Sequence, residues 1–150
     1  MIRRIDEHSA VAPQITPFEV AAIAQAGYAE VINNRPDDEE PGQPSGAAIA
    51  AACAQAGVTY RAIPVTHAGF SANQVEAMAN AINAAAGPVL AFCRSGTRSA
   101  HLWALARARM GDEPAVLVAQ AAQAGYDISG VRVMLDAYAA AAAAERAQQA

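Results

Sequence analysis

A chain of 150 residues that is 54% hydrophobic and 16% charged can bury one sizeable core, so its composition predicts a single domain. All ten basic residues are arginines and 14 acidic residues outnumber them, which disfavours a surface that binds nucleic acid. The first ten residues, MIRRIDEHSA, contain no apolar segment, and the longest apolar stretches are mostly alanine. We therefore expect a cytoplasmic protein that is neither secreted nor bound to a membrane.

The first half of the chain predicts strands and helices in alternation. Two apolar runs around a polar turn indicate a hairpin over residues 2–12. Thr16, Pro17 and Glu19 form a capping box that starts a helix, and Gly27 closes it. Further strands are expected over residues 29–33, 60–65 and 89–92, and further helices over 47–56 and 71–85.

Three helical segments end the chain: one begins at Ser99, one at Asp112 with Pro114, and one at Ser129. Alternating strands and helices favour an α/β fold, a single domain whose central, mainly parallel sheet of about four or five strands is flanked by helices. The acidic run Asp37–Glu40 lies in a loop rich in proline and glycine, and we interpret it as solvated rather than as a catalytic or metal site.

The most informative segment is CRSGTRS, Cys93–Ser99, which follows a buried strand and precedes a helix. Successive backbone N–H groups and the positive end of a helix favour a bound anion and a thiolate, so Cys93 is the candidate nucleophile. Gly96 permits the tight turn, Arg98 can grip an oxyanion with two N–H groups, and Ser99 can cap the helix and hydrogen-bond the thiolate. The remaining anion-binding candidates in this loop are Arg94, Ser95 and Thr97.

This loop resembles the rhodanese active-site loop, Cys-x-x-Gly-x-Arg-Ser, and is one residue shorter than the Cys-x5-Arg signature of protein tyrosine phosphatases. The segments VAPQITPFEVAAIAQAGYAEVIN and YRAIPVTHAGF are similar to the start of dual-specificity phosphatases. Together with INNRPDDEEPGQP they resemble the phosphatase-like domain of the beta-lactamase-hydrolase-like family, also labelled a sulfur transferase family. The resemblance covers residues 1–138 and leaves 139–150 as the end of an alanine-rich helix.

The resemblance implies a phosphatase-type fold with the cysteine loop at the carboxyl edge of the sheet, but it leaves the reaction open. His67 stands where dual-specificity phosphatases carry a general-acid Asp, and Phe92 stands where they carry a His. The short loop should suit a persulfide better than a phosphoryl group, so our first hypothesis is a sulfurtransferase. It would pass sulfur from thiosulfate or glutathione persulfide through a Cys93 persulfide to a thiol. The alternatives are a phosphatase that acts on a phosphate ester through a phosphocysteine, with His67 as acid, and a non-catalytic anion-binding module.

Parallel strands place their carboxyl ends at one edge, so Asn34, Arg35 and His67 should lie near the cysteine loop. Arg35 is either a second anion contact or a surface arginine paired with the acidic run, and His67 is either functional or a structural turn residue. His101 is interpreted as a packing or surface residue. The histidines and cysteines show no metal-ligand spacing, so neither a metal nor another cofactor is expected, and Cys53 is interpreted as a small helix residue without a disulfide.

Overall fold

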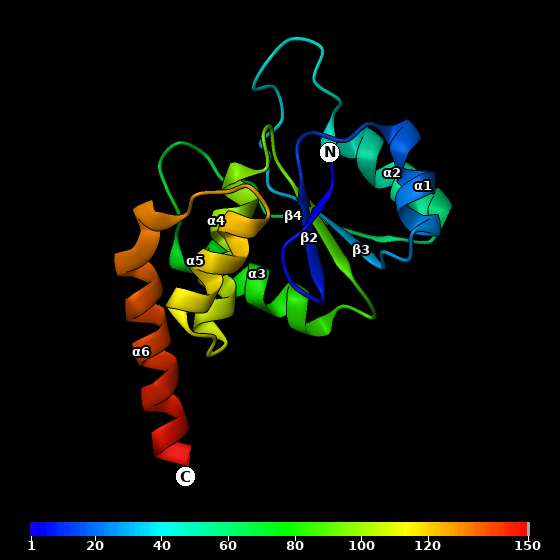
Figure 1. The fold of residues 1–150 in the computed structure, drawn as a ribbon. Helices are drawn as coiled ribbons and strands as arrows, with labels where there is room; N and C mark the ends of the chain where they lie inside the picture. The colour runs from blue at the N-terminus through cyan, green and yellow to red at the C-terminus, as the bar shows by residue number, and fades with distance from the viewer. Residues whose placement is uncertain (150) are drawn as a thin grey trace.

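A five-stranded sheet lies at the centre of the computed structural model, which describes residues 1–149 (Figure 1). The strands are β1 (Arg3–Arg4), β2 (Ser9–Ala12), β3 (Glu30–Asn33), β4 (Thr59–Ala62) and β5 (Val89–Phe92). Their order is β1-β2-β5-β3-β4; β1 and β2 form the predicted antiparallel hairpin, and all other pairs are parallel. The predicted α/β class with a mainly parallel sheet is confirmed.

Helices connect the parallel strands and make up the C-terminal third of the chain. The backbone N–H groups of Thr16 and Ser71 donate to the side chains of Glu19 and Gln74, as the capping boxes predict. No helix within residues 1–149 is long and apolar enough to span a membrane. The helices are η1 (Pro17–Glu19), α1 (Val20–Gln25), α2 (Gly46–Ala56), α3 (Ala72–Ala84), α4 (Thr97–Arg109), α5 (Pro114–Gln123), η2 (Ser129–Val131) and α6 (Arg132–Gln149).

Both faces of the sheet are covered, because successive side chains of a strand point to opposite faces. On β5, Leu90 and Phe92 join a hydrophobic cluster with α1 and α2, whereas Val89 and Ala91 join a second cluster with α3 and α4. Figure 1 shows α1 and α2 on one side of the sheet and α3 to α6 on the other. Cys53 is buried in the first cluster as a free thiol, in agreement with its interpretation as a helix residue.

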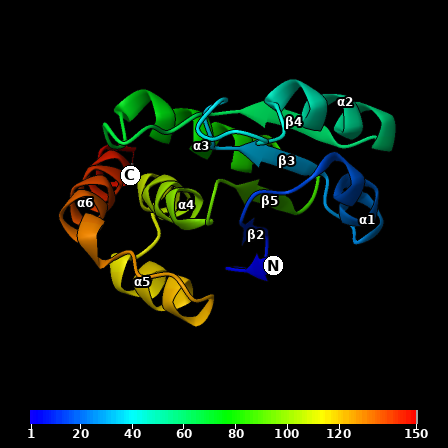
Figure 2. The same cartoon turned by 90° about the horizontal axis from the view of Figure 1, so that it is seen from above.

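Helix α4 lies between the sheet and the helices α5 and α6 (Figure 2). Its side chains Leu102, Trp103 and Leu105 are buried, as predicted for core residues. Helix α6 buries Leu135 and Ala142 and leaves the side chains of residues 143–149 exposed. The predicted domain limit at residue 138 stays a prediction. Residue 150, the last residue of the predicted C-terminal segment 139–150, lies outside the described residues.

Two element boundaries next to the site differ from the expected ones by two residues or more. Helix α4 begins at Thr97, not Ser99, because Gly96 takes a left-handed conformation (φ 95°) and acts as the N-cap residue. Strand β4 ends at Ala62, not at Val65, since Pro64 has no N–H to donate to the ladder. The carboxyl ends of β3, β4 and β5 nevertheless meet at one edge of the sheet, which brings the segments 33–35, 63–67 and 93–98 together.

Candidate active site

The cysteine loop runs from the end of β5 directly into α4. The N–H of Gly96 donates to the sulfur of Cys93 at 3.1 Å, so one backbone donor already points at the thiol from the positive end of the helix. The hydroxyl of Ser95 donates to Thr97 Oγ1 at 2.9 Å, which stiffens the outer side of the loop. The loop thus presents a backbone donor and the positive end of α4 to the sulfur of Cys93, whose side chain is completely buried in this conformation.

Gly96 is required at its position for two reasons. Its φ of 95° is a region that residues with a β-carbon rarely adopt. A β-carbon built there would also overlap the hydroxyl of Tyr126, which follows α5 and packs against the loop. Burial and the charge of Cys93 raise the pKa of Tyr126. Tyr126 was not predicted as a site residue, because no local pattern relates it to a loop about 30 residues earlier in the chain.

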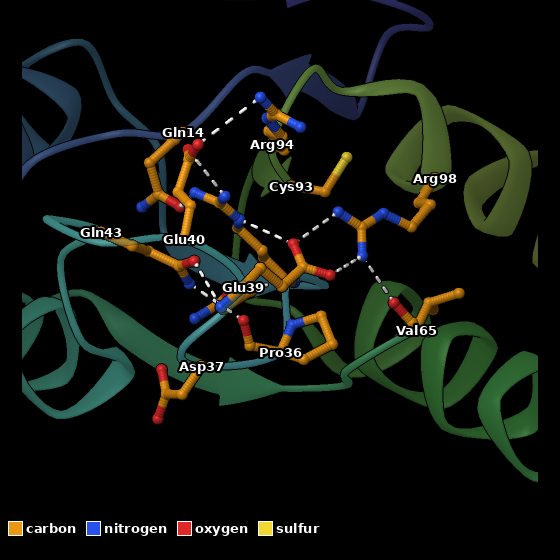
Figure 3. Close-up of polar contacts among 12 residues, drawn as sticks. Gln14, Pro36, Asp37, Glu39, Glu40, Gln43, Val65, Cys93, Arg94 and Arg98 are labelled. Atoms are coloured by element: carbon orange, nitrogen blue, oxygen red, sulfur yellow. Dashed lines mark hydrogen bonds and ion pairs between the residues drawn. The ribbon is translucent and has the colours of Figure 1, made fainter. Parts of the chain in front are cut away.

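The Arg98 guanidinium donates hydrogen bonds to the protein from its two Nη atoms, and the edge formed by Nε and Nη2 is free. Nη1 donates to Glu39 Oε2 at 2.7 Å and to the Val65 carbonyl at 2.8 Å, and Nη2 donates to Glu39 Oε1 at 2.9 Å. A guanidinium has five N–H donors, so within residues 1–149 the Nε–H and the second Nη2–H remain available. Figure 3 shows this edge on the side of the Cys93 sulfur, where it can bind an oxyanion with two parallel hydrogen bonds.

Glu39 holds the other edge of Arg98 and was not predicted as a site residue. Its hydrogen bonds with Arg98 and Arg35 lower its pKa to about 2, so the carboxylate is ionised at neutral pH. The interpretation of the acidic run as a solvated loop is wrong for Glu39, whose side chain is only 19% exposed. The acidic run was a signal for this role, since a carboxylate can fix an arginine that binds an anion. The sequence does not say which of the several acids in the run supplies the carboxylate.

Arg35 donates to other side chains of the protein from all three nitrogen atoms of its guanidinium. It is 4% exposed, and its guanidinium donates to Glu39, Glu40 and Gln14 at 2.8, 2.9 and 3.1 Å. It therefore fixes the acidic loop through Glu39 and Glu40, which corrects the expectation that Arg35 forms a second anion contact. Pairing with the acidic run was the other predicted outcome, although the arginine is buried rather than on the surface.

Asn34 and Ser99 are buried and bind one another instead of a ligand. The Ser99 hydroxyl donates to Asn34 Oδ1 at 2.7 Å, and Asn34 Nδ2 donates to the Ile63 carbonyl at 3.0 Å. Ser99 is inside the first turn of α4, so it is neither the helix cap nor, with its hydroxyl proton on Asn34, a donor to the thiolate. These bonds join the ends of β3 and β4 to the helix that follows Cys93.

A pocket of about 300 Å³ at the carboxyl edge is lined by Glu39, His67, Arg94 and Arg98. His67 is exposed, and the Arg94 side chain is 68% exposed with Nη2 3.5 Å from Glu40. The structure thus brings His67 and both loop arginines together. A larger open groove of about 580 Å³ between β4 and α3 is lined by four alanines with Tyr60, Arg61, Ile63 and Asn80, and contains no cysteine, serine or threonine. No cluster of three or more metal-ligating side chains occurs in the described part of the chain.

Comparisons with known proteins bear on the family and the fold of this chain. A family model for the phosphatase-like domain of beta-lactamase hydrolase-like protein matches residues 1–110. A beta-lactamase hydrolase-like protein of Xylella fastidiosa (strain Temecula1) is 40% identical over 101 residues, which are 67% of this chain and 23% of that protein. The chain thus spans about a quarter of the length of the curated relatives that it matches.

Solved structures show the same fold. A candidate phosphatase from Neisseria meningitidis Z2491 is 39% identical, has a TM-score of 0.79, and covers 91% of this chain and 97% of its own. PTPMT1, at 15% identity, has a TM-score of 0.78 and covers 99% of both chains. These similarities confirm the predicted phosphatase-type fold. They support the phosphatase alternative, whereas they give no support to the sulfurtransferase hypothesis.

Proposed function

The chain belongs to the family of phosphatase-like domains of beta-lactamase hydrolase-like proteins, and from this we propose that it is a phosphatase that hydrolyses phosphate monoesters through Cys93. The observation that carries the proposal is the free edge of Arg98, which faces the Cys93 sulfur while Glu39 and Val65 hold the opposite edge. This edge matches two oxygens of a phosphoryl group.

The reaction takes two steps. The Cys93 thiolate attacks phosphorus, so an S–P bond forms and the P–O bond to the alcohol breaks. His67, in its protonated form, gives a proton to the departing alkoxide, because it is the imidazole that lines the same pocket. Water then attacks the phosphocysteine, the S–P bond breaks, and His67 takes a proton from that water. Inorganic phosphate leaves, and the thiolate is restored.

Binding must uncover the thiol, because Cys93 has no exposed surface and is not among the residues that line the pocket. The free edge of Arg98 lies on the side of the sulfur, where a phosphoryl group would enter (Figure 3). The Glu39 bridge keeps the guanidinium plane in place while the phosphoryl group binds to this edge.

Sulfane-sulfur transfer stays a second candidate on one observation. Only four residues separate Cys93 from Arg98, and the N–H of Gly96 is already 3.1 Å from the sulfur. A loop this small can hold a persulfide anion with little change of shape. Thiosulfate as donor and glutathione as acceptor are the corresponding substrates.

We further propose that residues 1–138 form the catalytic unit and that the part of α6 after residue 138 takes no part in the reaction. Cys53 and Cys93 are both free thiols, which supports action in the reducing cytoplasm. No resident cofactor is needed for either reaction.

The test is turnover of an aryl phosphate by the wild type and by Cys93→Ser, with thiosulfate and cyanide as a parallel assay. We expect phosphate release that is lost in Cys93→Ser and no thiocyanate above that variant. Thiocyanate without phosphate release would replace the proposal with sulfur transfer. If neither product forms while sulfate still binds at the loop, the protein is an anion-binding module.

A further inference from the structure

We propose that His101 is a positioning residue for the His67 loop, residues 66–70, and that it acts by holding Phe70. The catalytic part of this inference rests on the proposed function, in which His67 is the acid. The structural part, that α4 holds the loop at both ends, does not depend on the reaction.

The first end of the loop is fixed at Val65. Its N–H donates to the Asn34 carbonyl at 2.9 Å, and its own carbonyl accepts from Arg98 Nη1 at 2.8 Å. The preceding carbonyl, of Pro64, accepts from Gln74 Nε2 at 2.9 Å. The chain therefore enters the loop from a position set by the same arginine that faces the nucleophile.

The middle of the loop has little to hold it. Thr66, His67, Ala68 and Gly69 are exposed. Ala68 N–H donates to the Thr66 hydroxyl at 3.2 Å, and Gly69 N–H donates to the Thr66 carbonyl at 3.4 Å. These two bonds form a tight turn with His67 at its tip. They shape the turn, but they do not attach it to the rest of the protein.

The second end is held by a ring stack. The rings of Phe70 and His101 lie 5.8 Å apart between centroids and within 6° of parallel. Phe70 is half-buried, whereas the four residues before it are exposed, so it is the loop's anchor. His101 is three residues after Arg98 on α4, and residues at this spacing share a helix face. One face of α4 thus contacts the loop at Val65 and at Phe70.

The orientation of the His101 ring is itself set. Its Nδ1 lies 2.7 Å from the Thr97 carbonyl, and because a carbonyl can only accept, Nδ1 carries the hydrogen. The ring is therefore attached to the first turn of the helix that begins the anion site. A shift of the Phe70 stack would move His67 relative to Arg98, and proton transfer requires a well-placed acid.

The experiment compares His101→Ala with His101→Phe, which keeps an aromatic ring for Phe70. The rate of amide hydrogen exchange at Ala68 and Gly69 reports directly how often the loop opens. We expect roughly three- to tenfold faster exchange in His101→Ala, the factor that corresponds to the loss of one aromatic pair, and near-wild-type exchange in His101→Phe. Exchange in β5 should be unchanged in both variants.

The catalytic readout is the dependence on the leaving group. An aryl phosphate with a good leaving group needs no acid, whereas an alkyl phosphate does. We expect His101→Ala to lower kcat/KM for the alkyl ester about tenfold more than for the aryl ester, and His101→Phe to restore the ratio. Equal losses for both esters, or unchanged loop exchange in His101→Ala, would overturn the inference. If the wild type hydrolyses neither ester, the proposed function fails, and the exchange data alone decide whether His101 holds the loop.

Discussion

Replacing Glu39 with glutamine removes the charge that connects Arg98 to Arg35. The carboxylate accepts three short hydrogen bonds, two from Arg98 and one from Arg35. Glutamine has nearly the same shape but only one acceptor oxygen, so at least one bond to a buried or half-buried guanidinium is lost. We expect a less stable protein and a less well oriented Arg98.

The magnitude follows from the pKa of Glu39, which these bonds lower from 4.5 to about 2. At 1.36 kcal/mol per pKa unit, the shift gives an upper limit of about 3 kcal/mol. Because the side chain is 19% exposed, screening by water reduces the expected loss to about 1–2 kcal/mol. The folded-state pKa is depressed, so this stability is complete above pH 4.5 and is lost as the pH falls toward 2. About two fifths of it should remain at pH 3.

The assay is urea denaturation of wild type and Glu39→Gln at pH 7 and at lower pH down to 3, with Glu40→Gln as the matched control. Glu40 contacts Arg35 and Arg94, but its side chain is 43% exposed, so its replacement should cost less. The difference between wild type and Glu39→Gln should shrink as the pH falls. A difference that is absent at pH 7, or that does not change with pH, would refute the bridge as a stabilising contact.

Three further substitutions test other parts of the site. Gly96→Ala should abolish turnover, because it strains a positive φ and overlaps Tyr126; activity equal to wild type in a folded variant would refute that role. Ser99→Ala should lower the free energy of unfolding by about 1–3 kcal/mol, since Asn34 Oδ1 loses its buried donor, and a change within error in a urea titration would contradict this. His67→Asn should lower kcat/KM for alkyl phosphates by about 10²- to 10⁴-fold and spare kcat/KM for aryl phosphates, because kcat/KM reports phosphorylation of the cysteine and not the later hydrolysis; equal effects on both esters would remove His67 as the acid.

The fold and the nucleophile loop could be predicted from the sequence because their signals are local. The buried strand before Cys93, the glycine turn and the helix after it are all encoded within about 20 neighbouring residues. The order of parallel strands then brings His67 to the same edge. Such patterns predict which segments lie at the same edge of the sheet, even though the sequence does not say which strands pair with one another.

The partners of these residues could not be predicted, because they depend on side-chain contacts between distant segments. Arg98 binds Glu39, which lies 59 positions away, and nothing in the acidic run distinguishes this carboxylate from its neighbours. Ser99 has a capping residue's chemistry, yet the turn at Gly96 starts the helix two residues earlier. Tyr126 reaches the loop only because α5 packs on α4, a contact that no motif records.

The central claim, that Cys93 attacks phosphorus, is tested most directly by trapping the intermediate. The wild type is mixed with an aryl phosphate, quenched in acid within the first turnovers, digested, and analysed by mass spectrometry of the peptide that contains Cys93. We predict the mass of one added phosphoryl group on Cys93 in wild type and none in Cys93→Ser. Phosphate release that continues while Cys93 stays unmodified, or that persists in Cys93→Ser, would contradict the account.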